Sequence, residues 1–277
     1  MKTIVVKKRS LNLKEYRLRS ALETDYEMLI TESCKVVDED GKLLILYIVF
    51  DDSVQTNELL ESLKTINYTT TTRISGLKTT SAIFGYSPRA AIRKDFCSST
   101  AMAKAQPKEH KVICDFGKEL AKIYKQEIPD IYQEHLEQTK NKVRNEWIIE
   151  DTPFTSGIVN KNNPLKYHFD KGNFKKVYSN MVVFKGHTAG GFLSCPEYGI
   201  GFELSNRSAL MFDGQNILHG VTPIKKLRPE AYRYSVVYYT LQSMWKCDTA
   251  LGEVERIKRV KTQREFERIK LIKGYGK

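Results

Sequence analysis

Two histidines and an aspartate have the residue types and the spacing of a mononuclear metal site. His168 and Asp170 stand two positions apart in YHFDKGNF (167–174), between segments rich in β-branched and aromatic residues. In an extended chain, side chains at i and i+2 point the same way, so this pair can converge on one ion. His219, in DGQNILHGVTP, is the third candidate ligand. Two histidines and one carboxylate leave half of an octahedron open, which is the ligand set of non-haem Fe(II) oxygenases.

A second His-x-acid triplet, His135 with Glu137, lies in the polar segment PDIYQEHLEQTKNKVRNEW. This segment has a proline near its start and no glycine, which predicts a helix. Positions i and i+2 of a helix lie about 200° apart, so these side chains cannot share an ion. We expect this pair at the surface, His110 to be solvated as well, and His187 to lie in a loop.

The open positions of such an iron site suit a bidentate 2-oxo acid and O2, and a second carboxylate on that acid needs a cation. Arg233 lies in YRYSVVYYTL (232–241), an alternating strand that places Ser235, Val237, Tyr239 and Leu241 on the same side. A guanidinium binds a carboxylate through two parallel hydrogen bonds, and Ser235 can add a third. The region must therefore fold so that distant strands become neighbours, as in a double-sheet jelly roll.

The charge of the chain suggests a polyanionic partner. The net charge is +12 and the pI is near 9.3. Asp170 is the only acid between positions 161 and 180, a stretch that also carries Lys161, Lys166, Lys171, Lys175 and Lys176. A lysine-rich solvated surface is the alternative reading of the charge, but the position of these lysines favours a cleft that attracts anions.

Cysteine usage and the absence of long apolar runs predict a soluble, cytoplasmic protein. The five cysteines are odd in number and scattered, at positions 34, 97, 114, 195 and 247. This pattern argues against a disulfide framework and for a reducing compartment. The opening MKTIVVKKRS has too few consecutive apolar residues for a signal peptide, and no run approaches a membrane span. We expect no membrane association and infer no obligate protein partner.

The pattern of elements predicts an α+β fold in three parts. Residues 1–68 read as an α/β extension, with KLLILYIVF as a buried strand. Residues 69–246 form the core, with a helical insert at about 107–145 and, after it, short β runs broken by Gly, Pro and Asp-Gly, which indicate a sandwich or barrel. Residues 247–277 form a basic tail that we expect to be helical; between contact with nucleic acid and docking on the barrel, we favour docking.

Five segments together resemble the TET/JBP family of 2-oxoglutarate and Fe(II) dependent dioxygenases, which oxidise the 5-methyl group of pyrimidines in DNA. They are FTSGIVN, HFDKGN, GGFLSCPEYG, ALMFDGQNILHGVTP and YRYSVVYY. The sequence looks most like the compact phage and microbial members. If the protein is phage-encoded, its expected location is the cytoplasm of the host. The resemblance covers roughly residues 70 to 245 and leaves both ends of the chain unexplained.

The resemblance implies a double-stranded β-helix core and a role for each site residue. His168, Asp170 and His219 would hold Fe(II), and Arg233 with Ser235 would hold 2-oxoglutarate, with O2 as the second cosubstrate. Asn173 matches a position that contacts the target base. One of the arginines of RISGLK and FGYSPRAAIR, among them Arg73 and Arg89, would meet the other end of 2-oxoglutarate or the DNA backbone. Lys171, from the lysine-rich stretch, is a further candidate to bind the DNA substrate. Tyr167, Phe169 and Phe174 are candidates to stack on an extruded base, against the commoner use of aromatics in packing.

The activity implied is hydroxylation of a base that is flipped out of methylated DNA, by ferryl hydrogen abstraction. The expected substrate is 5-methylcytosine, giving 5-hydroxymethylcytosine, with thymine as the alternative. One departure bears on the base: some members that oxidise 5-methylcytosine carry a histidine eight residues beyond the arginine, where this chain has Leu241. Two further readings are a 2-oxoglutarate oxygenase of a protein side chain or free nucleotide, and a DNA-binding jelly roll without catalysis.

Overall fold

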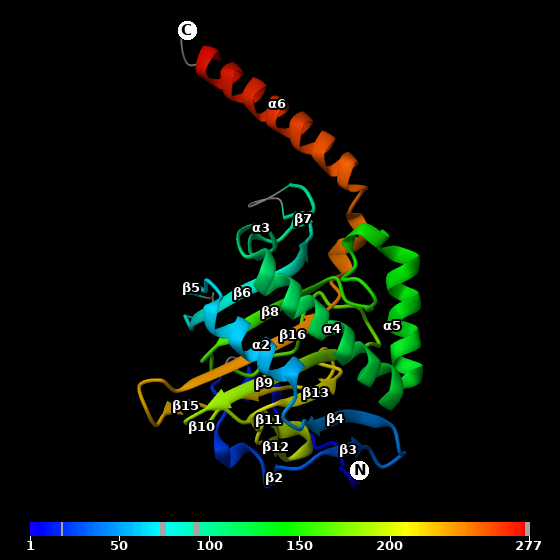
Figure 1. The fold of residues 1–277 in the computed structure, drawn as a ribbon, viewed down its shortest axis with the longest axis vertical. Coiled ribbons are helices and arrows are strands. Elements are labelled where there is room, and N and C mark those ends of the chain that lie inside the picture. Colours follow the sequence, from blue (N-terminus) through cyan, green and yellow to red (C-terminus); the bar gives the residue numbers. More distant parts are fainter. Residues whose placement is uncertain (18, 73–75, 91–94, 275–277) are drawn as a thin grey trace.

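The computed structural model describes residues 1–17, 19–72, 76–90 and 95–274, arranged as a large sheet with helices on one face and a smaller sheet on the other (Figure 1). The strands of the large sheet are antiparallel except for the pair β1 and β3. Their order is β1 (Lys2–Val5), β3 (Cys34–Val37), β4 (Leu43–Val49), β13 (Ser208–Phe212), β9 (Ser179–Gly186), β16 (Tyr232–Tyr239), β8 (Ser156–Lys161), β6 (Lys78–Ser87) and β5 (Thr69–Thr72), with β7 (Ser98–Ser99) beside β6.

The smaller sheet closes the sandwich over the middle of the large one. It contains β14 (Gly220–Val221), β11 (Leu193–Cys195), β12 (Ile200–Phe202) and β2 (Met28–Ile30), in that order. A separate pair, β10 (Thr188–Gly190) with β15 (Ile224–Lys226), lies outside it. Leu193, Ile200 and Phe202 pack with Met181 and Leu210 of the large sheet in one apolar cluster. Burial of this cluster between the sheets holds β9, β13 and β14 close together.

The helical region 107–145 consists of α4 (Pro107–Glu127) and α5 (Pro129–Lys142), each with a proline in its first turn. The apolar stripe of α4, which includes Ile113, Phe116 and Leu120, is buried against the large sheet and forms part of the core. Shorter helices are α1 (Leu13–Tyr16), α2 (Val54–Thr65) and α3 (Ala101–Ala105). Short 3-10 helices form at η1 (Glu23–Asp25), η2 (Asn145–Trp147), η3 (Pro196–Tyr198) and η4 (Gln242–Lys246). Among the described residues, no helix combines the length and the apolarity needed to cross a bilayer.

The N-terminal segment is built into both sheets. Strand β4 pairs along five residues with β13, and β2 pairs with β12. The division of the chain into an extension, a core and a tail stays a prediction, but the extension contributes directly to the sandwich that carries the candidate ligands.

The docking of the basic tail on the barrel, which we favoured from the sequence, is wrong for most of its length. The tail forms α6 (Ala250–Gly274), which projects away from the sandwich (Figure 1). Only its first turns are held: Glu253 is buried and accepts hydrogen bonds from the backbone N–H of Cys97 and from Arg89. Every residue from 261 to 272 is exposed. The apolar residues of the tail are spread around the helix, so they form no single face that could bury against the sheet.

The cysteine pattern argued against a disulfide framework, yet a disulfide forms among the described residues. Cys97 and Cys247, which are 150 residues apart in sequence, form a disulfide beside the base of α6. Cys34, Cys114 and Cys195 are free. The two paired cysteines are distant in sequence and meet only because the fold brings η4 against the segment that precedes α3, a contact that spacing cannot reveal. The reducing compartment inferred from the cysteines stays a prediction.

Candidate metal centre

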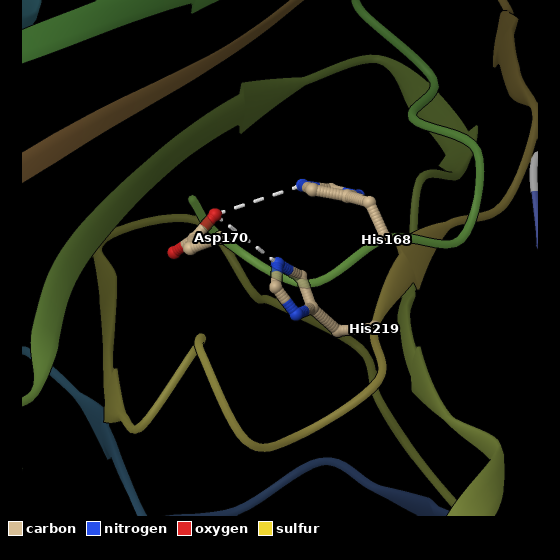
Figure 2. Close-up of side chains that lie close together, drawn as sticks. All are labelled: His168, Asp170 and His219. Carbon is tan, nitrogen blue, oxygen red and sulfur yellow. Dashed lines mark ion pairs between the residues drawn. The ribbon is translucent and has the colours of Figure 1, made fainter. Parts of the chain in front are cut away.

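The backbone places the three predicted ligands in one cluster (Figure 2). His168 and His219 face each other across an antiparallel bridge, in which each backbone N–H donates to the other residue's carbonyl, at 2.9 and 3.1 Å. Two residues on, the N–H of Asp170 donates to the carbonyl of Gly214 at 2.8 Å. The Oδ1 atom of Asp170 then lies 3.7 Å from Nε2 of His168 and 3.8 Å from Nε2 of His219.

Neighbouring groups orient each ligand toward a common point. Nδ1 of His168 lies 2.8 Å from the carbonyl of Lys166, and Nδ1 of His219 lies 2.9 Å from that of Ile217. Each Nδ1 is therefore the protonated nitrogen, which leaves the Nε2 lone pair for a metal. The other carboxylate oxygen of Asp170 accepts a hydrogen bond from Ser179 at 3.2 Å, and Ser179 accepts one from Asn173 at 3.1 Å.

This donor set fits Fe(II). Two imidazole nitrogens and one carboxylate oxygen lie within 4.8 Å of one another and can bind one face of an octahedron. Gly214 is required for this approach, because a Cβ at that position would lie 2.3 Å from Oδ2 of Asp170. Ligands on two separate segments, 168–170 and His219, are thus held for one ion.

A cavity of about 320 Å³ adjoins the cluster. One wall of the cavity is formed by alternate residues of β16 and by Leu241, which lies just beyond the strand. As the alternation in the sequence predicted, these residues are Arg233, Ser235, Val237, Tyr239 and Leu241. The cavity is therefore continuous from the three ligands to the guanidinium of Arg233.

Arg233 is a buried cation whose hydrogen-bonding capacity is not used. Its side chain is 2% exposed, and neither Nε nor Nη2 has a partner among the described residues. Burial lowers the pKa of Arg233 to about 10, so the group still carries its charge at neutral pH. A buried charge without a partner is costly, and a ligand carboxylate at this end of the cavity would satisfy it. A Cβ at Gly191 would lie 2.8 Å from Cδ of Arg233, so this glycine gives the arginine its room.

Two buried asparagines beside Ser235 were missed by the sequence analysis. Asn160 lies directly across from Ser235 in the β8–β16 register, and its amide donates to the Ser235 hydroxyl at 3.5 Å. The Asn160 carbonyl oxygen in turn accepts from Asn163 at 3.1 Å, and both asparagines line the cavity. Because the Ser235 oxygen accepts from Asn160, its own hydrogen is free to donate toward a carboxylate held by Arg233. Asn160 stands in the FTSGIVN segment, but only the strand register shows its role.

The residues predicted to contact substrate have different positions. Asn173 and Lys171 line the cavity. Arg89 does not: its guanidinium forms an ion pair with the buried Glu253 of α6, so its assignment to substrate is not supported by the geometry. Arg73 lies outside the described residues. The sequence could not distinguish these arginines because the partner of Arg89 is 164 positions away.

Two histidines were assigned wrongly to the solvent. His135 is fully buried between α5 and the sheet, where its Nε2 lies 3.0 Å from Thr240 Oγ1. His110 is half-buried and accepts the N–H of Gly85 at 3.0 Å. His187 is exposed between β9 and β10, as expected for a loop residue.

The three aromatic residues that could stack on a base differ in their exposure. Tyr167 and Phe174 are completely buried in packing. Phe169 is half-buried and lines the cavity, so it is the one of the three placed where a base could meet it. Of the lysines, Lys171, Lys175 and Lys176 are exposed.

The sandwich, the open-faced triad and the buried arginine together define a non-haem iron oxygenase domain. Comparison with known proteins agrees: residues 82–242 match the Tet_JBP family model, described as the oxygenase domain of the 2OGFeDO superfamily. Because this match covers more than half of the chain, the chain belongs to the Tet_JBP family and is an oxygenase. The superfamily implies Fe(II) and 2-oxoglutarate, which the triad and Arg233 fit.

Two curated relatives and one solved structure show how far the likeness extends. Thymine dioxygenase JBP1 of Trypanosoma brucei brucei is 27% identical over 184 residues, which is 62% of this chain and 21% of the relative. Bifunctional helicase and thymine dioxygenase JBP2 of the same organism (strain 927/4 GUTat10.1) is 29% identical over 120 residues, or 43% of this chain and 11% of the relative. The chain thus spans about a fifth or less of these relatives.

The structure of NgTET1 in complex with 5mC DNA superimposes with a TM-score of 0.64 at 14% identity, covering 93% of this chain and 90% of that one. This likeness concerns the fold, and it confirms the predicted α+β class with a double-stranded β-helix core.

Proposed function

We propose that this chain oxidises the 5-methyl group of a pyrimidine in DNA, with Fe(II) as metal and 2-oxoglutarate and O2 as cosubstrates. The observation that carries the proposal is the cavity that joins an open-faced His-Asp-His cluster to the buried Arg233, of which Nε and Nη2 have no partner among the described residues. Membership in the Tet_JBP family and the thymine dioxygenase activity of the JBP relatives support the substrate class.

Each group of site residues has a separate role in the proposed reaction. His168, Asp170 and His219 would hold the iron, and Arg233 with Ser235 would bind the distal carboxylate of 2-oxoglutarate. When bound, iron and 2-oxoglutarate would activate O2, which is the oxidant: one of its oxygen atoms would enter the methyl group to give hydroxymethyl, and the other would enter succinate, with loss of CO2 from 2-oxoglutarate. The apolar wall, including Val237 and Leu241, limits water around the reacting methyl group.

The target base must leave the helix to be oxidised, because a 5-methyl group within stacked DNA cannot reach a metal cluster inside a cavity. Phe169, Lys171 and Asn173 line this cavity and offer an aromatic face, a cation and an amide. The exposed lysines 171, 175 and 176 would hold phosphates beside the extruded nucleotide.

Two bases are candidates. The resemblance of the sequence implies 5-methylcytosine. Thymine is favoured by a specific observation: the curated relatives are thymine dioxygenases, and the apolar Leu241 lines the cavity where a histidine would otherwise face the base. Both bases present the same methyl group and differ at C4, so the amide of Asn173 could hydrogen-bond to either.

Succinate release, measured with Fe(II), 2-oxoglutarate and ascorbate, tests the proposal. We expect turnover that is stimulated by DNA and absent in Asp170→Ala, because loss of the carboxylate removes a metal ligand and leaves the backbone bridge of His168 and His219 intact. Thermal unfolding of the variant checks that it folds.

The other readings give other results. Turnover that DNA does not stimulate would indicate a protein or nucleotide substrate, and no turnover by the wild type would indicate a DNA-binding jelly roll. An active Asp170→Ala variant would contradict the assignment of the metal site.

A further inference from the structure

A basic groove outside the metal centre runs between the end of α5 and η4. We call it the α5–η4 groove; it has a volume of about 590 Å³, and its lining includes Lys140, Lys142, Arg144, Glu146 and Trp245. Three cations face one acid, so the groove carries a net positive charge. A phosphate chain is the complementary partner.

The two lysines of the groove are free to bind an anion. Arg144 is engaged with Asp248 at 3.2 Å, and Glu146 accepts the N–H of Ala250. Lys140 and Lys142 are exposed and form no ion pair with a described residue. Gln138 donates to the carbonyl of Lys175 at 3.1 Å, so the exposed Lys175 and Lys176 lie near the same end of α5.

Trp245 gives the groove an aromatic surface. It is 41% exposed, whereas the other tryptophan, Trp147, is 5% exposed. Its ring packs edge-on against Phe174 at 5.1 Å, and Nζ of Lys142 lies 4.3 Å from its centroid. An exposed aromatic ring held by a cation in a basic groove is the arrangement that proteins use to bind nucleic acid strands.

The groove is connected to the cavity by a short segment. Leu241 and Asn173 bridge each other in the cavity wall, and Trp245 follows Leu241 by one turn of η4. At about 2.0 Å per residue in such a turn, Trp245 lies about 8 Å farther along the segment, or about two nucleotide steps of 3.4 Å in a duplex strand. A strand with one base in the cavity can therefore place its neighbouring nucleotides in the groove.

We propose that the α5–η4 groove binds the DNA strand next to the extruded nucleotide, with phosphates on Lys140 and Lys142 and a base or sugar against Trp245. This inference rests on the proposed function and assigns the surface that holds the substrate. It makes the groove part of the binding machinery, while the reacting group stays in the cavity.

Equilibrium binding of the full chain to a short duplex with one central 5-methylcytosine tests the groove. We expect Lys140→Ser/Lys142→Ser to weaken binding roughly tenfold and to reduce the slope of log affinity against log salt by about two, one for each lost phosphate contact. The control, Lys122→Ser/Lys125→Ser, removes the same charge from exposed positions at the other end of the α4–α5 pair and should keep the wild-type slope.

Tryptophan fluorescence gives a second readout, because Trp245 is the exposed one of the two tryptophans. DNA should quench the wild type and leave Trp245→Phe, which keeps an aromatic ring against Phe174, nearly unchanged. Thermal unfolding confirms that each variant folds.

The outcomes separate the two proposals. If the wild type binds and oxidises DNA while the groove variants match it in affinity, slope and quenching, the proposed DNA binding by the groove is wrong and the proposed function is retained. This result is also expected if the groove binds an acidic protein. Equal losses in the groove and control variants would also overturn the groove, since net charge alone would then explain them. A wild type that binds no DNA would overturn both.

Discussion

At the scale of single residues, the site combines three convergent metal-binding atoms with a buried cation. Two imidazole nitrogens and one carboxylate oxygen lie within 4.8 Å of one another. Arg233 remains a cation although burial lowers its pKa to about 10, and its Nε and Nη2 atoms have no partner in the part of the chain that the structure describes. Both features become favourable only when a metal and a carboxylate are bound.

Asn160 provides a test of the carboxylate end of the cavity. Asn160→Asp would replace the amide that donates to Ser235 by an acceptor and would bring a negative charge toward the ligand carboxylate. We expect 2-oxoglutarate to bind at least tenfold more weakly, measured by titration calorimetry with Mn(II) in place of iron. Asn206→Asp is the matched control, because Asn206 uses its side-chain oxygen to accept the N–H of Lys185. Equal affinity in the wild type and Asn160→Asp would show that Asn160 does not orient Ser235.

At the scale of elements, strand alternation carried most of what the sequence could predict. The i, i+2 spacing of His168 and Asp170 and the alternating side chains of β16 led to the correct cluster and the correct cavity wall. Contacts between distant segments could not be found in this way. The hydrogen bond between Asn160 and Ser235 depends on strand register. Two further contacts depend on where α6 begins: the ion pair of Arg89 with Glu253 and the disulfide between Cys97 and Cys247.

His135 is a different kind of error, because the information was present in the sequence. The buried face of α5 carries Tyr132, His135 and Thr139, at i, i+3 and i+7. This helical spacing was overlooked because the segment is polar overall, and histidine was treated as a surface residue.

The burial of His135 predicts an acid-sensitive link between α5 and the sheet. Burial lowers the pKa of His135 to about 3, so below its ordinary pKa near 6.5 the unfolded chain gains a proton that the folded chain excludes. The contribution of neutral His135 to the free energy of unfolding is therefore fully present above a pH near 6.5 and declines as the pH falls toward about 3. Between neutral pH and pH 5 the loss is about 2 kcal/mol.

Urea unfolding of the wild type and His135→Phe at these two pH values measures this loss. Phenylalanine suits the aromatic surroundings of Tyr124, Phe154 and Phe174, and the Thr240 hydroxyl keeps its bond to the carbonyl of Pro153. The stability difference between the two proteins should change by about 2 kcal/mol in favour of the variant at the lower pH. A difference that does not change with pH would mean that His135 is not held neutral.

At the scale of the whole molecule, the sandwich separates chemistry from contact with the partner. The metal cluster and Arg233 lie between strands of the two sheets, where packing fixes them. The exposed positive charge lies outside this region, on the lysines near the cavity, in the α5–η4 groove and along α6, which projects from the body (Figure 1). This arrangement suits an enzyme whose polyanionic substrate binds over a wide surface and inserts a single base.

Mass spectrometry of nucleosides would detect oxidation of a pyrimidine base in DNA by this protein. Duplexes that contain 5-methylcytosine, and otherwise identical duplexes that contain only thymine as a methylated base, would be incubated with the protein, Fe(II), 2-oxoglutarate and ascorbate, and then digested. A hydroxymethyl pyrimidine nucleoside should form with the wild type and not with Asp170→Ala, and its identity will name the base. Conversion of 2-oxoglutarate to succinate without any oxidised nucleoside from either duplex would show that the protein does not oxidise a pyrimidine in DNA.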